Sequence, residues 1–179
     1  MQSIDILAQA LERCADKENC LFSTADFSSL FPDFTKENMR MLLSRVAKRG
    51  LLERVCNGIY LFSRVSYDSS VILFRTACKL RAQFFNYVSF ETVLSRSGII
   101  SQLPLAWITV MTGGRKGVID CGRFGFIEFI HTEKKQENIA TGLHFDTQSG
   151  MLWASDALAL QDMKDAKRPF DLVDASFRA

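Results

Sequence analysis

The sequence has only two histidines, and no two of its five cysteines stand at Cys-x-x-Cys spacing. Zinc sites of standard spacing take their ligands from such pairs, so the sequence argues against a zinc site of that kind. The simplest interpretation of the cysteines is five reduced thiols, several of them buried as small apolar side chains. We therefore expect a chain with no metal, no cofactor and a reducing, cytoplasmic environment.

Long apolar runs are also missing. No stretch approaches the roughly 18 to 20 uninterrupted apolar residues of a membrane span, and the first residues lack the basic start of a signal peptide. These absences predict a cytoplasmic protein with no membrane partner. The apolar fraction of 47% excludes intrinsic disorder, and 179 residues suffice for one ordinary domain or two small ones.

The sequence also lacks a large excess of positive or negative charge, because its formal net charge is only +2. That total hides an uneven distribution along the chain. The balance is −4 over residues 1–34, +5 over residues 35–66, +3 over residues 67–130 and −2 over residues 131–179. Since a local basic region is more informative about nucleic-acid binding than the total, segment 35–66 is the first candidate for a functional surface.

The first 50 residues contain three helical patterns. The first, over residues 3–15, repeats apolar side chains every three or four positions. The second begins with the capping-box spacing Ser23-x-x-Asp26 and has room for about two turns. The third, over residues 35–50, has Thr35 as its N-cap, an aliphatic stripe on one face and mostly basic side chains on the other.

A hairpin signal follows the third helical pattern. Two short β-prone runs, residues 52–55 and 59–62, flank Cys56-Asn57-Gly58. Asn-Gly between apolar runs predicts a type I′ turn, in which both central residues have positive φ. The order of helix, short helix, basic amphipathic helix and hairpin is typical of a winged helix-turn-helix, which we expect over residues 1–66.

In a winged helix-turn-helix, the third helix enters the DNA major groove and the hairpin, or wing, lies against phosphates or the minor groove. Arginine can read guanine and asparagine can read adenine through paired hydrogen bonds. The candidate DNA-binding residues are Lys36, Asn38, Arg40, Ser44, Arg45, Lys48, Arg49, Arg54 and Asn57. Replacing Arg45 or Arg54 by alanine is predicted to weaken DNA binding without unfolding the protein.

Residues 67–179 form a second predicted domain. Helical patterns over residues 69–85 and 90–98 precede three β-prone runs, at residues 106–112, 116–122 and 124–132. A further strand is expected at residues 142–147, and residues 151–165 predict a strand that leads into a helix with Ser155 as N-cap. The fold class expected for the whole chain is α+β, with an antiparallel sheet in this second domain.

No motif in the second domain predicts catalysis. The segment TGGRKG has glycines and a basic pair but lacks the P-loop spacing and the helix that should follow, so it predicts a hairpin tip. His131 and His144 lie on strand-like runs without a matching serine or cysteine nucleophile motif. We therefore do not expect an enzyme.

Two segments, taken together, resemble the AbiEi-type antitoxins of bacterial type IV toxin–antitoxin systems. The first ends in RVAKRGLLERVCNGIYLF and is similar to that family's wing signature at Leu43, Arg49, Gly50, Leu51, Leu52, Arg54, Gly58 and Tyr60. The second, YVSFETVLSRSG, is similar at Tyr87, Ser89, Glu91, Leu94 and Gly98. A third, in residues 154–163, is similar at Ala154, Ser155, Ala159, Leu160 and Asp162, with Asp156, Ala157 and Leu158 in place of the family's Pro-Glu-Lys.

The resemblance implies a transcriptional repressor that binds inverted repeats in its own promoter, with two copies on one operator. It also implies an antitoxin whose functional partner is a nucleotidyltransferase-like toxin. Two alternatives stay open at this point: a stand-alone winged-helix transcriptional regulator, and a protein-interaction module without antitoxin activity.

Overall fold

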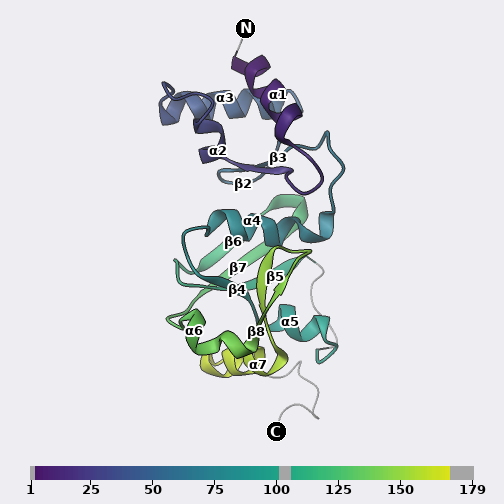
Figure 1. The fold of residues 1–179 in the computed structure, drawn as a ribbon, viewed down its shortest axis with the longest axis vertical. Coiled ribbons are helices and arrows are strands. Elements are labelled where there is room, and N and C mark those ends of the chain that lie inside the picture. The colour runs from purple at the N-terminus through teal and green to yellow at the C-terminus, as the bar shows by residue number, and fades with distance from the viewer. Residues whose placement is uncertain (1–2, 101–105, 170–179) are drawn as a thin grey trace. The chain divides into compact units, whose positions relative to one another are not determined.

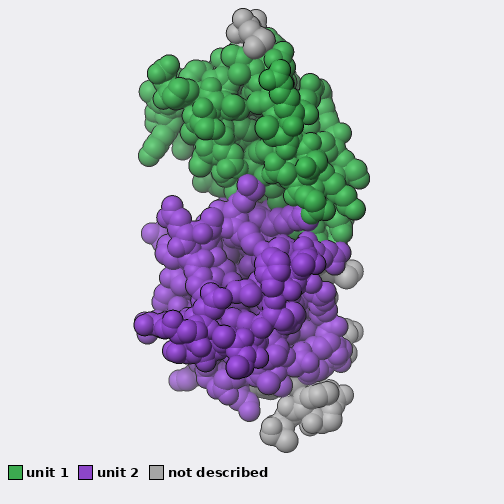
Figure 2. All heavy atoms as spheres, viewed as in Figure 1, with its two compact units in different colours: residues 1–72 green, residues 73–179 purple. Residues whose placement is uncertain are grey.

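The computed structural model describes residues 3–100 and 106–169. The chain divides into two compact units, residues 1–72 and residues 73–179 (Figure 2). The sequence patterns place the boundary after residue 66. The whole chain is of the α+β class, with one sheet in each unit (Figure 1). Within the described ranges, no helix combines the length and the apolar character that crossing a membrane requires.

Unit 1 contains three helices and a three-stranded antiparallel sheet. In chain order its elements are α1 (Ser3–Cys14), β1 (Leu21–Ser23), α2 (Thr24–Ser28), α3 (Lys36–Lys48), β2 (Glu53–Cys56) and β3 (Ile59–Leu61). The strand order is β1-β3-β2. The three predicted helices and the predicted hairpin are confirmed, whereas the three-residue strand β1 was not expected.

The core of unit 1 lies between the helices and one face of the sheet. Leu7 of α1 and Leu43 of α3 have no exposed surface, and Phe27 of α2 is 2% exposed. Burying an aliphatic or aromatic side chain of this size stabilises a fold by about 1.5–3 kcal/mol. The apolar stripe of α3 therefore decides which face of that helix points into the core and which is left to solvent.

The β2–β3 turn differs from the predicted type I′ geometry. Gly58 has a φ of 82°, but Asn57 does not adopt a positive φ. The pairing shifts register between Arg54 and Cys56, which marks a β-bulge in β2. Because a bulge increases the local twist by itself, the hairpin closes without the second left-handed residue that a type I′ turn needs.

Unit 2 is built around a six-stranded sheet with the order β6-β7-β5-β4-β9-β8. Its strands are β4 (Asn86–Val88), β5 (Trp107–Thr112), β6 (Gly117–Asp120), β7 (Phe126–His131), β8 (Leu143–Asp146) and β9 (Met151–Ala154). Its helices are α4 (Ile72–Leu80), which starts at the last residue of unit 1, α5 (Glu91–Arg96), α6 (Gln136–Ile139) and α7 (Asp156–Asp165).

Helices cover both faces of this sheet. Tyr87 of β4 bonds to Asp162 of α7, while Trp153, which pairs with the next residue of β4, stacks on Phe74 of α4 at 5.2 Å. Since successive side chains of a strand point to opposite faces, α4 and α7 lie on opposite sides of the sheet (Figure 1).

The sheet of unit 2 is mixed, so the expectation of an antiparallel sheet was wrong. Two pairings, β4 with β9 and β5 with β7, are parallel. The three consecutive runs 106–112, 116–122 and 124–132 do form strands, but they do not form a meander. β7 lies between β5 and β6, because β6 folds to the edge and pairs only with β7.

Helix boundaries in unit 2 also differ from the expected ones. The first helix ends at Leu80 rather than near residue 85. In the second, Phe90 takes the N-cap position with a φ of 58° and without a side-chain capping hydrogen bond, while the Ser89 hydroxyl donates to Asp162. Ser155 caps α7 as predicted, with its hydroxyl accepting a hydrogen bond from the Leu158 backbone at 3.3 Å.

Candidate functional site

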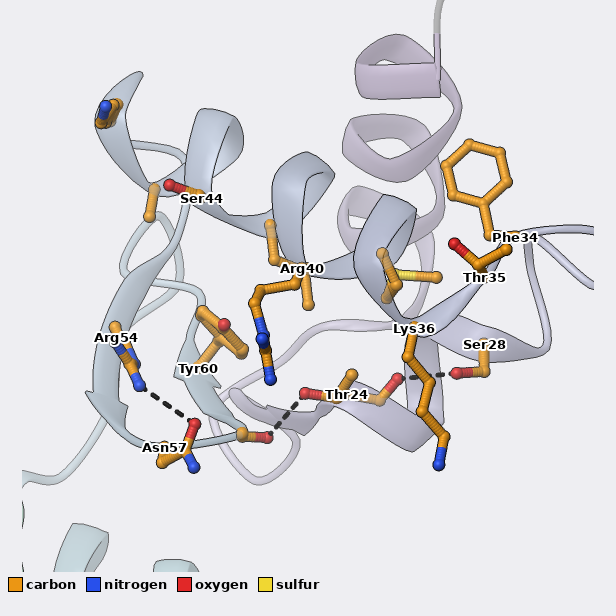
Figure 3. A pocket seen from close by; sticks show the side chains of 15 residues that line it. Thr24, Ser28, Phe34, Thr35, Lys36, Arg40, Ser44, Arg54, Asn57 and Tyr60 are labelled. Atoms are coloured by element: carbon orange, nitrogen blue, oxygen red, sulfur yellow. Dashed lines mark hydrogen bonds between the residues drawn. The ribbon is translucent and has the colours of Figure 1, made fainter.

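Unit 1 has a groove of about 790 Å³ between α3, the start of α2 and the β2–β3 hairpin (Figure 3). Its lining includes six of the nine candidate residues: Lys36, Arg40, Ser44, Lys48, Arg54 and Asn57. Four of these come from α3 and two from the hairpin. The predicted basic helix and the predicted hairpin, which were identified from different sequence patterns, therefore meet at one surface.

α3 presents its polar side chains to the groove because its other face is held in the core. Thr35 caps the helix, accepting a hydrogen bond from the Asn38 backbone N–H at 3.1 Å. Leu42, 1% exposed, anchors the buried side. Residues four apart share a helix face, so Lys36 and Arg40 both extend from α3 on the side of α2 and the hairpin (Figure 3).

The hairpin holds its own arginine in place. Arg54 Nη2 donates to the side-chain oxygen of Asn57 at 3.0 Å, and its Nε donates to the Cys56 carbonyl at 3.3 Å. The turn itself is fixed to the start of α2, because the Thr24 backbone N–H donates to the Gly58 carbonyl at 2.9 Å. A side chain that is already ordered loses less conformational entropy when a ligand binds.

The groove carries positive charge on its walls. Four of its lining residues are cationic and solvent-exposed: Lys36, Arg40, Lys48 and Arg54. Among the described residues, those that line the groove include no carboxylate. Threonine, serine, asparagine and tyrosine side chains supply the remaining polar lining, so the groove offers cations and neutral hydrogen-bonding groups to an anionic ligand.

Three candidate residues lie outside this groove, namely Asn38, Arg45 and Arg49. At about 100° per residue they point roughly 140° to 180° away from Arg40 around the helix axis. All three are exposed, and Arg45 Nε donates to the Met41 carbonyl at 3.4 Å. The structure therefore separates the two arginines that the sequence predicts to matter, Arg45 and Arg54, onto different surfaces.

The groove also includes residues that sequence patterns missed. Thr24 and Ser28 of α2, Phe34 before α3 and Tyr60 of β3 all line it. The Ser23–Asp26 capping box did mark the start of α2, and both of its hydrogen bonds form. The position of α2 next to the hairpin, however, depends on the pairing of β1 with β3. A strand of three residues is too short to be recognised from a local sequence pattern.

Unit 2 holds a second concentration of polar groups, around the fully buried Asp162. Its carboxylate accepts hydrogen bonds from the Ser89 hydroxyl at 2.6 Å, from the Tyr87 hydroxyl at 3.3 Å and from Lys134 Nζ at 2.6 Å. Lys134 also pairs with Asp165 at 2.7 Å. Tyr87 and Ser89, which are more than 70 positions away from Asp162 in the sequence, thus converge with Lys134 on one buried carboxylate.

The protonation equilibria of this cluster follow from its contacts. Burial, reinforced by the charge of Asp162, raises the pKa of the Tyr87 hydroxyl. Burial alone would lower the pKa of Lys134, but the hydrogen bonds to Asp162 and Asp165 outweigh it, so the pKa is raised. Tyr87 and Ser89 have no exposed surface. The polar groups therefore satisfy one another and fix α7 to β4.

A neighbouring ion-pair group contains Arg168, which bonds to Glu91 at 3.2 Å and to Glu128 at 2.5 Å. Its guanidinium lies 5.2 Å from the centre of the Phe90 ring. Within residues 3–100 and 106–169, no three histidine, cysteine or acidic side chains cluster in a way that would hold a metal ion. All five cysteines lie among the described residues and none of them forms a disulfide; Cys20, Cys56 and Cys121 are buried.

The sequence matches no protein-family model and no curated protein. The groove of unit 1 and the Asp162 cluster of unit 2 are therefore interpreted from their own geometry.

Proposed function

We propose that unit 1 is a winged helix-turn-helix domain that binds double-stranded DNA through the groove between α3 and the β2–β3 hairpin. The order of its elements, with a strand between the first two helices and a hairpin after the third, supports this assignment. The sheet order β1-β3-β2 pairs the hairpin with the strand that precedes α2, which supports the interpretation of the hairpin as a wing. The observation that carries the proposal is the convergence of four cations on one groove without a lining carboxylate.

The proposed contacts follow from the chemistry of DNA. α3 acts as the recognition helix, and its first turns, with Lys36 and Arg40, lie nearest the base edges in the major groove. Lys48 and Arg54 contact phosphates, and the Asn57 amide group, whose oxygen already accepts from Arg54, keeps its NH₂ to donate. Arg54 is the best-ordered of these side chains, because two hydrogen bonds hold it on the hairpin.

The wider role that we propose is that of a cytoplasmic repressor which autoregulates its operon and acts as an antitoxin of the AbiEi type. The similarity of the wing and of segment 87–98 to that family supports it. Further support comes from the Asp162 cluster, which joins Tyr87 and Ser89 to a residue of the third similar segment. The expected partners are promoter DNA with inverted repeats, bound by two copies, and a nucleotidyltransferase-like toxin.

A stand-alone regulator would bind DNA in the same way without neutralising a toxin. A protein-interaction module would instead use the basic groove for an acidic protein partner and would be indifferent to promoter sequence. These alternatives differ in one measurable property, which is the preference for the DNA upstream of the protein's own gene over a scrambled duplex of equal length and composition.

Fluorescence anisotropy with these two duplexes tests the proposal at moderate salt. We expect preferential binding of the upstream duplex by the parent protein. Arg40→Gln should weaken it by about 5- to 150-fold, since a good bidentate contact to a base contributes about 1–3 kcal/mol of discrimination.

Arg49→Gln is the matched control. Like Arg40, Arg49 is an exposed arginine, but it stands at the C-cap of α3 and lies outside the groove. Its affinity should stay close to that of the parent. Arg45→Gln decides between the two faces of α3: a loss as large as that of Arg40→Gln would move the interface away from the groove. Equal affinity of the parent for both duplexes would exclude sequence-specific repression.

A further inference from the structure

Unit 2 has a hollow of about 510 Å³ that the proposed function does not use. It lies at the turn between β5 and β6, next to the end of β7. Its lining residues are Phe84, Gly113, Gly114, Arg115, Lys116 and His131. Four of these residues, 113–116, belong to the segment TGGRKG, for which the sequence predicts a hairpin tip. That prediction was wrong, because β5 and β6 do not pair with each other and the segment connects two strands that both pair with β7.

The lining of the hollow includes an aromatic ring that lies close to the backbone of the turn. Phe84 is 48% exposed although it is a large apolar side chain. A Cβ atom placed on Gly114 would come within 2.9 Å of Cδ2 and 3.1 Å of Cε2 of the Phe84 ring. The Phe84 ring can therefore lie against the turn only because residue 114 has no Cβ atom. About half of the Phe84 side chain stays open to solvent.

The turn beneath the ring is held by side chains. Arg81 Nη2 donates to the Arg115 carbonyl at 3.1 Å, and the Gly114 N–H donates to Thr112 Oγ1 at 3.0 Å. His131 Nδ1 lies 2.9 Å from the Gly114 carbonyl. Because a carbonyl only accepts, Nδ1 carries the proton, which leaves Nε2 as the free polar atom of the ring.

The rim of the hollow is basic. Arg115 and Lys116 are both exposed, and the structure gives neither an ion pair with any described residue. None of the described residues that line the hollow is acidic. A half-exposed aromatic ring beside two cations and a histidine matches the chemistry of a nucleobase with its phosphate, because a base can stack on the ring while the cations hold the phosphate.

We propose that this hollow is a second nucleic-acid site, which binds one nucleotide of a single strand by stacking its base on Phe84. A duplex does not satisfy it, because the faces of paired bases are covered by their neighbours. A free nucleotide presents the same base and phosphate, but a single strand adds further phosphates for Arg115 and Lys116. The proposal does not depend on duplex binding by unit 1.

The test measures binding of a fluorescent oligoadenylate of about ten nucleotides, long enough for one stacking site and its flanking phosphates. The full-length protein carries R40Q and R54Q, so that the groove of unit 1 contributes little. Phe84→Leu keeps an apolar side chain on Gly114 but removes the stacking face. We expect it to weaken binding by about 10-fold, because the base loses its aromatic stacking partner while an apolar side chain remains. R115Q/K116Q should weaken binding and reduce its salt dependence.

Phe145→Leu and Lys164→Gln are matched controls, as an exposed phenylalanine on β8 and an exposed lysine on α7. Both should bind like the parent, and circular dichroism should show all variants folded. Equal affinity of Phe84→Leu and Phe145→Leu would overturn the proposal, and so would equal binding of an abasic oligomer. Displacement of the strand by AMP at a comparable concentration would assign the site to free nucleotides and overturn the single-strand claim.

Discussion

Asp162→Ala is expected to destabilise unit 2 strongly. The change removes one buried acceptor that serves three donors, the hydroxyls of Tyr87 and Ser89 and the ammonium group of Lys134. Both hydroxyl-bearing residues are fully buried, so water cannot replace the lost acceptor. Lys134 is less affected, because its side chain is 28% exposed and keeps Asp165 as a partner.

The expected magnitude follows from these differences. A buried donor left without an acceptor costs about 1–3 kcal/mol, and two hydroxyls lose theirs. Removing one partner of a buried ion pair typically destabilises a protein by about 3–5 kcal/mol. We therefore expect Asp162→Ala to lower the free energy of unfolding of unit 2 by about 3–5 kcal/mol. Asp165→Asn is the matched control, since Asp165 bonds to the same lysine but is 47% exposed, and it should cost less than about 1 kcal/mol.

Urea denaturation followed by tryptophan fluorescence measures this effect selectively, because Trp107 and Trp153 both belong to unit 2. With a denaturant slope of about 1–3 kcal/mol per molar urea, the midpoint should fall by at least about 1 M. In the Asp162→Ala background, Ser89→Ala should be nearly neutral, because its hydroxyl has already lost its partner. Equal midpoints for Asp162→Ala and Asp165→Asn would refute the assignment of Asp162 as the centre of the cluster.

Three further predictions concern pH, salt and helix capping. The pKa of Asp146 is lowered below its ordinary 3.8, mainly by hydrogen bonds from Ser149. Burial opposes this shift, and the positive charge of Arg96 adds to it. The stability that Asp146 contributes is present above its ordinary pKa and is lost as pH falls through the lower folded-state pKa. The difference in unfolding free energy between parent and Asp146→Asn should therefore shrink from about pH 5 to about pH 3, and a constant difference would contradict the assignment. The logarithm of the affinity for duplex DNA falls linearly with the logarithm of the salt concentration. If Arg54 neutralises one phosphate, Arg54→Gln should make this slope shallower by about 0.9. An unchanged slope would argue that Arg54 contacts a base instead. Ser23→Ala removes half of the α2 capping box and should lower the free energy of unfolding of unit 1 by about 0.5–2 kcal/mol. Melting followed by far-ultraviolet circular dichroism measures this change. An unchanged melting curve would mean that solvent replaces the cap.

Local signals in the sequence were sufficient for most individual elements. Thr35 and Ser155 start α3 and α7 as N-caps, and Asn57-Gly58 forms the predicted hairpin. These features depend on hydrogen bonds between residues three or four positions apart, so a short window of sequence contains all the partners. The turn type was missed because it depends on a bulge in β2, where the pattern of apolar residues does not change.

Long-range pairing could not be predicted in the same way. Local patterns located the runs that form β5, β6 and β7, and we expected an antiparallel sheet, but such patterns carry no information on which strands pair. The actual order places β7 between the other two. Ser89 shows the same limit at the level of a side chain: it directly precedes the predicted helix 90–98, but its hydroxyl donates to Asp162, which is distant in sequence. For the candidate site, helix periodicity identified the basic residues, whereas the position of the hairpin decided which of them share a surface.

The two units use their charged side chains differently, and salt should separate these uses. In unit 2, Lys134 and Arg168 are engaged by partly or fully buried carboxylates. In the groove of unit 1, the structure shows no ion pair between Lys36 or Arg40 and any described residue. Ionic strength screens exposed charges strongly and buried pairs much less. Raising salt from about 0.05 M to about 0.5 M should therefore weaken duplex binding by several orders of magnitude, while the urea midpoint of unit 2 changes little. A parallel loss of both would mean that the ion pairs of unit 2 are solvated, and the stability assigned to the Asp162 cluster would have to come from apolar packing.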